Sequence, residues 1–329
     1  MSLGGVARNV AEASHRVISC HASQLSSLLV APIGDDAFGR LLYEETAQLG
    51  MRVDGLVKTQ KRTAVCNMVL DSHGGLVGGV ADMDITAAME GPNVAEPTSV
   101  IKSTRIIPAV AASLNVTTTK LAPISFCSPN SLELAQLFHS AEALDLTSHP
   151  AWWRVMDSLS LGSAFRSDLE QLARRKVCDA DSSKGTLSFL IEEGVAQMAV
   201  KLLPFFQHLT VKCGEQGVVV VMRLSGTEAA RSLWAGGRSD TSQRSIIAHG
   251  HSNDVVILQH FPPHPVDEVI NVTGAGDSFV GALLANLLQY PDTFLNPERL
   301  RNTMFSAQNA AILSLQSPYA VSPLLSGVQ

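Results

Sequence analysis

The sequence of 329 residues lacks the patterns that mark disulfide-rich, zinc-binding, membrane-spanning and polyanion-binding proteins. Its five cysteines are scattered, odd in number and never arranged as CxxC, which predicts neither a disulfide framework nor a zinc site. No apolar run approaches the roughly 18 residues that a membrane-spanning helix needs. The formal net charge of -6 argues against a nucleic-acid partner, because such proteins are usually basic. These absences favour a reducing, cytoplasmic setting, with import into an organelle left open.

What the sequence does contain is enough apolar material for a large core. Hydrophobic residues make up 46% of the chain and charged residues 16%, a balance typical of globular rather than disordered proteins. The length suits one large α/β domain or two ordinary ones. We expect a single domain over residues 1–329 whose partners are small molecules, with neither nucleic acid nor a membrane among them.

The hydrophobic pattern alternates between the periods of helices and strands. Helical spacing over 4–20 is followed by an apolar, strand-like run over 27–33 and by helical spacing again over 40–49, with Gly50 as its C-terminal cap. Two β-prone runs within 63–80 flank a turn-rich linker, which predicts a hairpin. This order predicts an α/β fold with a mainly parallel sheet, helices on both of its faces, and the hairpin as a small lid.

Three later regions extend this pattern. The β-branched run at 218–222 is typical of a buried strand. Residues 145–200 are interpreted as a helical insertion that lies outside the catalytic core. Residues 223–265 are rich in Ser, Gly, His and Arg, which predicts irregular, loop-dominated structure.

Residues 271–277 have the sequence Asn-Val-Thr-Gly-Ala-Gly-Asp and lead into a helix that we expect to begin at Asp277 or Ser278. Their small side chains let backbone amides converge at the helix N-terminus, where the amides and the helix dipole can hold an anion. A carboxylate beside such an anion site can accept the proton of a hydroxyl nucleophile during phosphoryl transfer. Asp277 is therefore the candidate general base; the alternative is that it only caps the helix.

Five segments, in order along the chain, carry a resemblance to a known family. They are Gly-Gly-Val-Ala-Arg-Asn at 4–9, Ile-Gly-Asp-Asp-Ala-Phe-Gly at 33–39, Asn-Ser-Leu-Glu at 130–133, Lys-Cys-Gly-Glu-Gln-Gly at 212–217, and the string at 271–279. Together they resemble the PfkB, or ribokinase-like, family of carbohydrate kinases. Asn271 stands where most members carry Asp, and it is similar, with segments 81–85 and 96–102, to the pseudouridine kinases of that family.

The resemblance implies a kinase that transfers a phosphoryl group from ATP, with Mg²⁺, to the 5'-hydroxyl of pseudouridine. It is also compatible with a monovalent cation near the anion site and with a homodimer. The implied site residues are Asp277 as general base; Gly274, Ala275 and Gly276 in an anion hole; Gly5, Asn9, Thr63 and Asn67 at the substrate; Lys212, Gly214, Gly217 and Thr273 at the nucleotide; and Asn130 and Glu133 at magnesium, mostly through water. Taken singly, these residues have simpler interpretations, such as a solvent-facing Asn67 and Glu133 or an ordinary turn at 214–217.

The sequence departs from the family pattern in two places. Family members begin with a strand that places an Asp against the substrate hydroxyls, but here Gly4 and Gly5 stand at the start. Members also carry a β-α unit before the segment 96–102, and residues 86–95 are too few for a unit of about 30 residues. Three interpretations stay open: a truncated sequence, a fragment completed by a partner, or a non-catalytic homologue that binds ligand. Another ribokinase-like nucleoside or sugar kinase is a further alternative.

Overall fold

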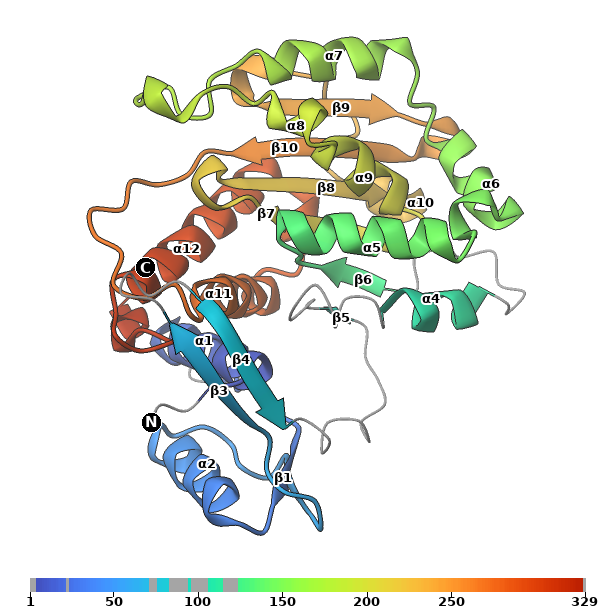
Figure 1. Ribbon diagram of the computed structural model, residues 1–329. Coiled ribbons are helices and arrows are strands. Elements are labelled where there is room, and N and C mark those ends of the chain that lie inside the picture. Colours follow the sequence, from blue (N-terminus) through green and yellow to red (C-terminus); the bar gives the residue numbers. More distant parts are fainter. Residues whose placement is uncertain are drawn as a thin grey trace. The chain divides into compact units, whose positions relative to one another are not determined.

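The computed structural model describes residues 4–21, 24–70, 76–82, 94–95, 106–114 and 124–327. The chain divides into two compact units (Figure 1), which are described separately here. Unit 1 comprises residues 1–91, 265–291 and 302–329, and unit 2 comprises residues 92–264 and 292–301. The single domain expected over 1–329 stays a prediction. The pseudouridine-kinase-like segment 96–102 and most of the short stretch 86–95 lie outside the described residues.

Unit 1 combines helices with two small two-stranded sheets. Strands β1 and β2 pair in parallel, whereas β3 and β4 form an antiparallel hairpin. The hairpin expected within 63–80 is thus confirmed, and its function as a lid stays a prediction. The elements are α1 (Val6–His21), β1 (Ala31–Gly34), α2 (Ala37–Gln48), β2 (Leu56–Thr59), β3 (Val65–Leu70), β4 (Leu76–Asp82), α11 (Ala275–Gln289) and the short helix η8 (Pro323–Gly327), with α12 (Pro297–Leu315) belonging partly to each unit.

The ends of α2 follow from its local sequence. Asp36 caps the helix, because its side chain accepts a hydrogen bond from the Gly39 amide. At the other end Gly50 adopts a positive φ of 76°, and its amide donates to the carbonyl of Ala47, as expected for a C-terminal glycine. The preceding strand begins at Ala31, later than the apolar run at 27–33 had predicted, because the earlier part of that run makes only an isolated bridge at Leu28.

Unit 2 contains a six-stranded sheet in the order β5-β6-β7-β8-β10-β9. Its strands are β5 (Val94–Ala95), β6 (Ile124–Cys127), β7 (Phe206–Lys212), β8 (Val218–Leu224), β9 (Ser245–His249) and β10 (Val255–Phe261). Its α-helices are α4 (Ile106–Leu114), α5 (Ser131–Ala143), α6 (Pro150–Ser158), α7 (Ser163–Ala173), α8 (Phe189–Glu192), α9 (Val195–Leu202) and α10 (Gly226–Arg231). Short 3-10 helices are η2 (Leu146–Ser148), η3 (Ser182–Lys184), η4 (Gly214–Gln216), η5 (Thr241–Gln243), η6 (His251–Asn253) and η7 (Thr293–Leu295).

The six-stranded sheet is mixed, although a mainly parallel one was expected. Its β5-β6 and β6-β7 pairs are parallel, whereas β7-β8, β8-β10 and β10-β9 are antiparallel. The turn between β7 and β8 is too short for a crossover, and such a turn can join only antiparallel strands. The prediction of irregular structure over 223–265 is wrong for β9 and β10. Every residue of β10 is buried, and the strand pairs with β8 and with β9.

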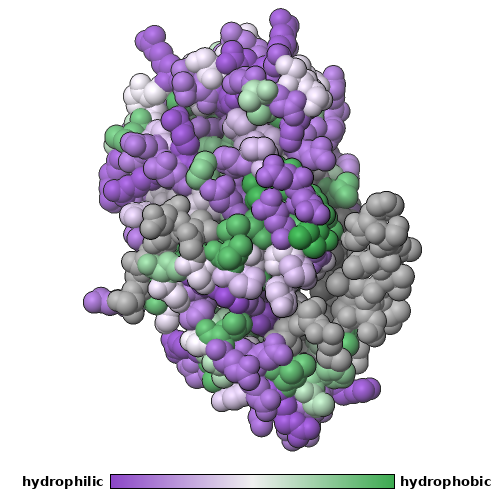
Figure 2. All heavy atoms as spheres, turned by 90° about the vertical axis from the view of Figure 1, so that its left-hand side faces the viewer, coloured by the Kyte–Doolittle hydropathy of each residue, from purple (hydrophilic) through white to green (hydrophobic). Residues whose placement is uncertain are grey.

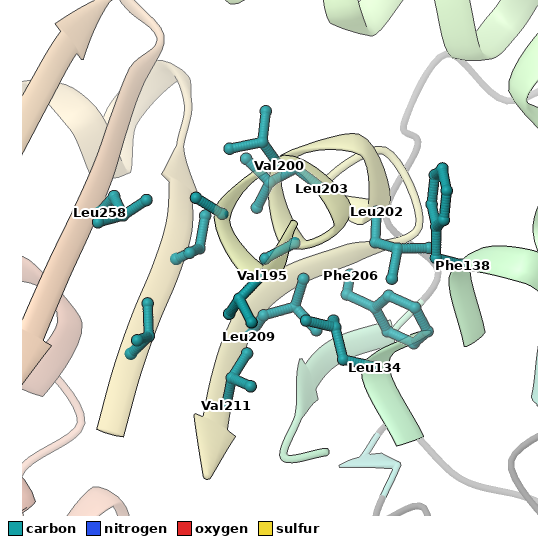
Figure 3. Close-up of a cluster of buried hydrophobic side chains, with 14 of the residues drawn as sticks. Leu134, Phe138, Val195, Val200, Leu202, Leu203, Phe206, Leu209, Val211 and Leu258 are labelled. Carbon is teal, nitrogen blue, oxygen red and sulfur yellow. The ribbon is translucent and has the colours of Figure 1, made fainter. Parts of the chain in front are cut away.

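The core of unit 2 lies between the sheet and a layer of helices. Figure 3 shows Leu134 and Phe138 of α5 and Val195 and Leu202 of α9 beside side chains from β7 and β10. Trp152 of α6 joins the same core, and its indole nitrogen donates to the carbonyl of Lys201 in α9 at 2.9 Å. The helices expected over 145–200 are therefore present and contribute to this core, while their status as an insertion stays a prediction.

Polar residues dominate the face that is drawn in Figure 2, where apolar residues form separate patches. Among the exposed large apolar side chains, Val269, Ile270 and Val272 are close in sequence and come just before Gly274. Within the described residues, no helix is both long and apolar enough to cross a membrane.

Candidate active site

The glycine-rich segment ends in a tight turn at the N-terminus of α11. Gly274 caps the helix with a φ of 80°, which disfavours any residue with a side chain, and an added Cβ would lie 2.0 Å from the carbonyl oxygen of Ala320. The helix therefore begins at Ala275, two or three residues before the expected start at Asp277 or Ser278. Gly274, Ala275 and Gly276 are half-buried. Amides in the first turn of a helix have no partner within the helix, so this end of α11 can bind an anion.

Asp277 lies in the first turn of α11 and does not occupy the cap position. The interpretation that it serves only as the N-cap is therefore wrong. Its carboxylate accepts a hydrogen bond from the side-chain nitrogen of Asn9, with 2.8 Å between Nδ2 and Oδ2. Asn9 belongs to α1 and is only 3% exposed. The structure thus brings together two predicted site residues that are 268 positions apart.

The other residues predicted at the substrate behave differently from one another. Gly5 directly precedes α1, is exposed, and adopts a φ of 104° with open space where a side chain would stand. Thr63 is buried, and its hydroxyl donates to Asp36 Oδ1 at 2.8 Å and accepts from the Gly34 amide at 2.9 Å. Both of these bonds hold local structure together. The side chain of Asn67 lies outside the part of the chain that the structure describes.

The Thr63 contact also affects the charge of Asp36. The backbone amide of Thr63 donates to Asp36 Oδ2 at 2.8 Å. This hydrogen bond, followed by the one from Gly39, holds the pKa of the Asp36 carboxyl below its usual value. Asp36 is therefore a charged cap that joins the start of α2 to the chain just before β3.

Asn271 and Thr273 shape the approach to the turn. The amide of Thr273 donates to the side-chain oxygen of Asn271 at 2.9 Å, and the amide of Asn271 donates to the carbonyl of Leu315 at 3.1 Å. An Asx turn of this kind needs only a side-chain oxygen, so an aspartate would make it equally well. The local contact therefore does not explain why the chain carries Asn here.

In unit 2, Asn130 and Glu133 form the N-terminal cap of α5. Asn130 Oδ1 accepts from the Glu133 amide, and Glu133 Oε2 accepts from the Asn130 amide, both at 2.9 Å. This reciprocal arrangement is a capping box, which Asn at the cap and Glu three residues later predict by their spacing. Glu133 is only 5% exposed, so the simpler interpretation of a solvent-facing side chain is wrong.

Three of the four residues predicted at the nucleotide, Lys212, Gly214 and Gly217, lie at the turn between β7 and β8, whereas Thr273 belongs to the glycine-rich segment. The amide of Lys212 donates to the carbonyl of Pro129 at 2.9 Å, which places the end of β7 beside Asn130. Gly214 has a φ of 56° and open space beside it, whereas a Cβ on Gly217 would lie 2.2 Å from the carbonyl oxygen of Phe261. Burial raises the pKa of the Cys213 thiol to about 12, which leaves it unreactive.

The predicted residues thus form two groups, one in each unit. Sequence reasoning found both groups but missed how their members pair. It also missed a buried ion triad on α1, in which Glu12 binds Arg8 at 2.6 Å and Arg16 at 2.7 Å. The spacing of four residues between these charges was a signal for it.

Comparison with known proteins identifies the family of the chain. The chain matches the family described as pfkB family carbohydrate kinase over residues 1–107 and 250–326. It is 25% identical over 244 residues to a pseudouridine-metabolizing bifunctional protein of Schizosaccharomyces pombe. That match covers 73% of this chain and 27% of the relative, so the chain spans little more than a quarter of the relative's length.

Two solved structures show the same fold. A fructokinase of Xylella fastidiosa with bound ATP has a TM-score of 0.53 at 16% identity and covers 97% of this chain and 86% of its own. A ribokinase of Arabidopsis thaliana complexed with ribose and ATP has a TM-score of 0.51 at 15% identity, with 99% and 88% covered. The expected ribokinase-like α/β fold is confirmed.

Proposed function

Because the chain belongs to the pfkB family of carbohydrate kinases, we propose that it transfers the γ-phosphoryl group of ATP to a hydroxyl group of a sugar or nucleoside. The observation that carries this proposal is the position of Asp277 in the first turn of α11, directly after a glycine-rich turn that can bind an anion. In this reaction the acceptor hydroxyl loses its proton to Asp277 while its oxygen bonds to the γ-phosphorus. The bond from that phosphorus to the bridging oxygen breaks, and ADP leaves with the electron pair.

The acceptor that we propose is pseudouridine, phosphorylated at its 5'-hydroxyl. The similarity to the pseudouridine-metabolizing protein of S. pombe supports this choice. So does Asn271, which stands where most family members carry Asp and in this resembles the pseudouridine kinases. Substrate contacts are proposed for Gly5 and Asn67, and nucleotide contacts for Lys212, Gly214, Gly217 and Thr273. Thr63 is a weaker candidate, because its hydroxyl already bonds to Asp36 and Gly34.

Magnesium is proposed to bind with ATP rather than in a protein cage. Within the described residues, no group of three or more His, Cys, Asp or Glu is arranged to hold a metal ion. Mg²⁺ in kinases usually takes phosphate oxygens, waters and one or two carboxylates. A single carboxylate such as that of Glu133 is therefore enough for a metal that arrives with ATP. Glu133 would contribute through water, because its Oε2 already belongs to the capping box. The ion would neutralise charge on the phosphate oxygens.

An ATP-coupled assay with several acceptors tests the proposal. Pseudouridine, uridine, ribose, adenosine and fructose 6-phosphate are compared at equal concentrations, and pseudouridine is expected to give the highest kcat/KM. Preference for another acceptor would contradict pseudouridine while leaving the kinase proposal in place. If no acceptor is phosphorylated although ATP binds, the chain is a ligand-binding homologue and not an enzyme.

The Asp277→Asn variant then tests the general base. Replacing the carboxylate by an amide removes proton acceptance, and kcat is expected to fall about 100- to 10,000-fold. Asp54→Asn is a matched control, because Asp54 is exposed and pairs only with Arg52 at the surface among the contacts that the structure records. Its turnover should equal that of the wild type. An unchanged kcat in Asp277→Asn would rule out Asp277 as the base.

A further inference from the structure

We infer that His260 is a positioning residue, which holds the nucleotide loop (residues 213–217, between β7 and β8) by a hydrogen bond to the backbone carbonyl of Gln216. The inference rests on the proposed function, because the loop contains Gly214 and Gly217, for which nucleotide contacts are proposed. His260 lies on β10, and its Nε2 is 2.7 Å from the Gln216 carbonyl oxygen. All of these residues belong to unit 2.

The neighbours of the His260 ring decide which of its nitrogens carries the proton. Arg244 Nη1 lies 3.4 Å from His260 Nδ1, and a guanidinium can only donate hydrogen bonds, so Nδ1 is the acceptor. Burial lowers the pKa of His260 to about 4, which keeps the ring neutral. A neutral imidazole whose Nδ1 accepts has its single proton on Nε2. The ring therefore donates from Nε2 to the Gln216 carbonyl, which can only accept.

This bond holds a peptide group that closes the nucleotide loop. At the other end of the same peptide group, the Gly217 amide donates to the Gly214 carbonyl at 3.0 Å, and the Gly217 carbonyl accepts from the Cys213 amide at 2.8 Å. A peptide group beside a glycine turns over readily, because glycine populates positive and negative φ, and Gly217 has a φ of 88°. Turning the Gln216–Gly217 peptide over would break its bonds to His260 and to Gly214. His260 therefore favours one conformation of the loop.

The strand that carries His260 is a fixed support for the nucleotide loop. β10 pairs with β8 along its whole length and with β9 on its other side. Phe261, the next residue of β10, lies so close to the loop that an added Cβ on Gly217 would be 2.2 Å from its carbonyl oxygen. The strand thus contacts the loop at two successive residues. We expect the loop to keep its conformation before ATP binds, which reduces the ordering cost of binding.

The side chains around this contact are costly for a structural core. His260 is 1% exposed and Arg244 is 5% exposed, and burial of polar or charged groups costs free energy that their partners must offset. Arg244 also has a φ of 61°, which residues with side chains rarely adopt. Its Nη1 donates to the Lys176 carbonyl at 2.7 Å, and its Nη2 lies 3.0 Å from Asp179 Oδ1. Backbone strain and strongly shifted pKa values are concentrated at functional sites, which supports a function for His260 beyond packing.

Two substitutions of His260 test the inference through ATP binding. His260→Phe keeps a ring but has no donor, whereas His260→Gln keeps an N–H donor that can reach the position of Nε2. The Kd and the KM for ATP are expected to rise about three- to tenfold in His260→Phe, the range that the loss of one hydrogen bond gives. The KM for the acceptor should stay within about twofold, and His260→Gln should bind ATP nearly as tightly as the wild type. Equal Kd values for ATP in the wild type and His260→Phe would overturn the inference.

Trp152→Phe is the matched control, because it removes the same kind of bond from the same unit. The indole nitrogen of Trp152 donates to the Lys201 carbonyl at 2.9 Å, and neither residue belongs to the nucleotide loop. Like His260→Phe, this substitution deletes a buried ring N–H and keeps an aromatic ring. Its melting temperature should fall while its Kd for ATP stays the same. If it weakens ATP binding as much as His260→Phe does, the effect is a general loss of stability and the inference fails.

Two NMR measurements do not depend on turnover. The ring ¹⁵N shifts of His260 should show the form with its proton on Nε2; a proton on Nδ1 would overturn the inference, because Nε2 could then not donate. The Gly217 amide should exchange with solvent faster in His260→Phe than in the wild type, and equal exchange rates would likewise contradict the inference. A wild-type chain that binds ATP but phosphorylates no acceptor would refute the proposed kinase activity and leave the ATP measurements to decide on His260.

Discussion

His208 and His260 are buried within the six-stranded sheet, and burial keeps both imidazoles neutral. His208 of β7 stacks on Phe294 with 4.1 Å between ring centroids and 14° between planes. Its desolvation lowers its pKa to about 3. His260 of β10 contacts the carbonyl of Gln216 at 2.7 Å, and burial lowers its pKa to about 4. Both values lie well below the value of 6.5 for a solvated histidine.

This difference predicts that the protein loses stability in mild acid. Above pH 6.5 both histidines are neutral in the folded and the unfolded chain. Between that pH and the folded pKa, only the unfolded chain binds the proton, so the free energy of unfolding decreases as pH falls. Each histidine contributes at most about 1.4 kcal/mol per pH unit.

His208→Phe tests the larger of the two shifts and keeps an aromatic ring against Phe294. Urea unfolding at pH 7.5, 6 and 5 should show a smaller loss of stability with acid in the variant than in the wild type. Comparing each protein with itself at pH 7.5 removes any packing effect of the substitution. If the free energy of unfolding decreases equally between pH 7.5 and pH 5 in the two proteins, His208 is not protonated on unfolding in this range.

Sequence patterns identify site residues more readily than they identify the partners of those residues. The string at 271–277 was enough to single out Asp277, because helix start and glycine turn are local features. The bond from Asn9 was not foreseen, because it depends on how α1 packs against α11. Thr63 was assigned to the substrate, but Asp36 and Gly34 occupy its hydroxyl. Contacts between residues distant in sequence leave no local signal.

At the scale of elements, the start of α5 combines a structural function with a proposed functional one. The capping box of Asn130 and Glu133 satisfies amides at the helix N-terminus, and it is complete in the described structure. Magnesium binding through water is proposed for the same two residues. Glutamine can replace glutamate at the N3 position of a capping box, which Glu133 occupies here. A substitution to glutamine therefore removes the negative charge of the side chain while keeping the cap.

Glu133→Gln should therefore preserve stability while weakening the response to Mg²⁺. Asn130→Ala, in contrast, should lower the free energy of unfolding by about 1 kcal/mol through loss of the cap. The measurements are urea unfolding and the Mg²⁺ concentration that gives half-maximal kinase activity. If Glu133→Gln needs no more Mg²⁺ than the wild type, Glu133 acts only as part of the cap.

The elements that the sequence predicted are those with strong local patterns. Four consecutive valines predicted β8, and apolar residues at helical spacing predicted α1 and α2. Strands β9 and β10 were missed, because polar residues such as Gln259 and His260 stand within β10 and loop-like residues surround it. Both side chains are buried, and the strand that carries them pairs with β8 on one side and β9 on the other. Tertiary pairing, and not local propensity, determines this part of the sheet.

For the whole molecule, the family match covers more of unit 1 than of unit 2. Residues 1–107 and 250–326 include nearly all of the first unit, whereas the helices α5 to α9 all lie outside the match. The α/β class was predictable from alternating elements, but the division into two units was not, because it depends on contacts between 265–291 and the first part of the chain. The proposed anion site and the proposed general base both belong to unit 1.

Ligand-dependent stability is the prediction that concerns the whole chain, because it separates binding from catalysis. A ligand that binds only the folded state raises the free energy of unfolding by about 2.7 kcal/mol when its concentration is 100 times its Kd. Thermal unfolding should therefore shift upward with ATP and Mg²⁺, and upward again with pseudouridine. Chelation of Mg²⁺ by EDTA should remove most of the ATP effect, because the metal is proposed to bind through the phosphates.

The Asp277→Asn variant makes this measurement decisive, since it lacks the proposed base but keeps the glycine-rich turn. Its melting temperature should rise with both ligands as in the wild type, although it turns over little substrate. A wild type that shifts with ATP but not with pseudouridine would point to another acceptor. A wild type that shifts with neither ligand would contradict the kinase proposal itself, because phosphoryl transfer requires both to bind.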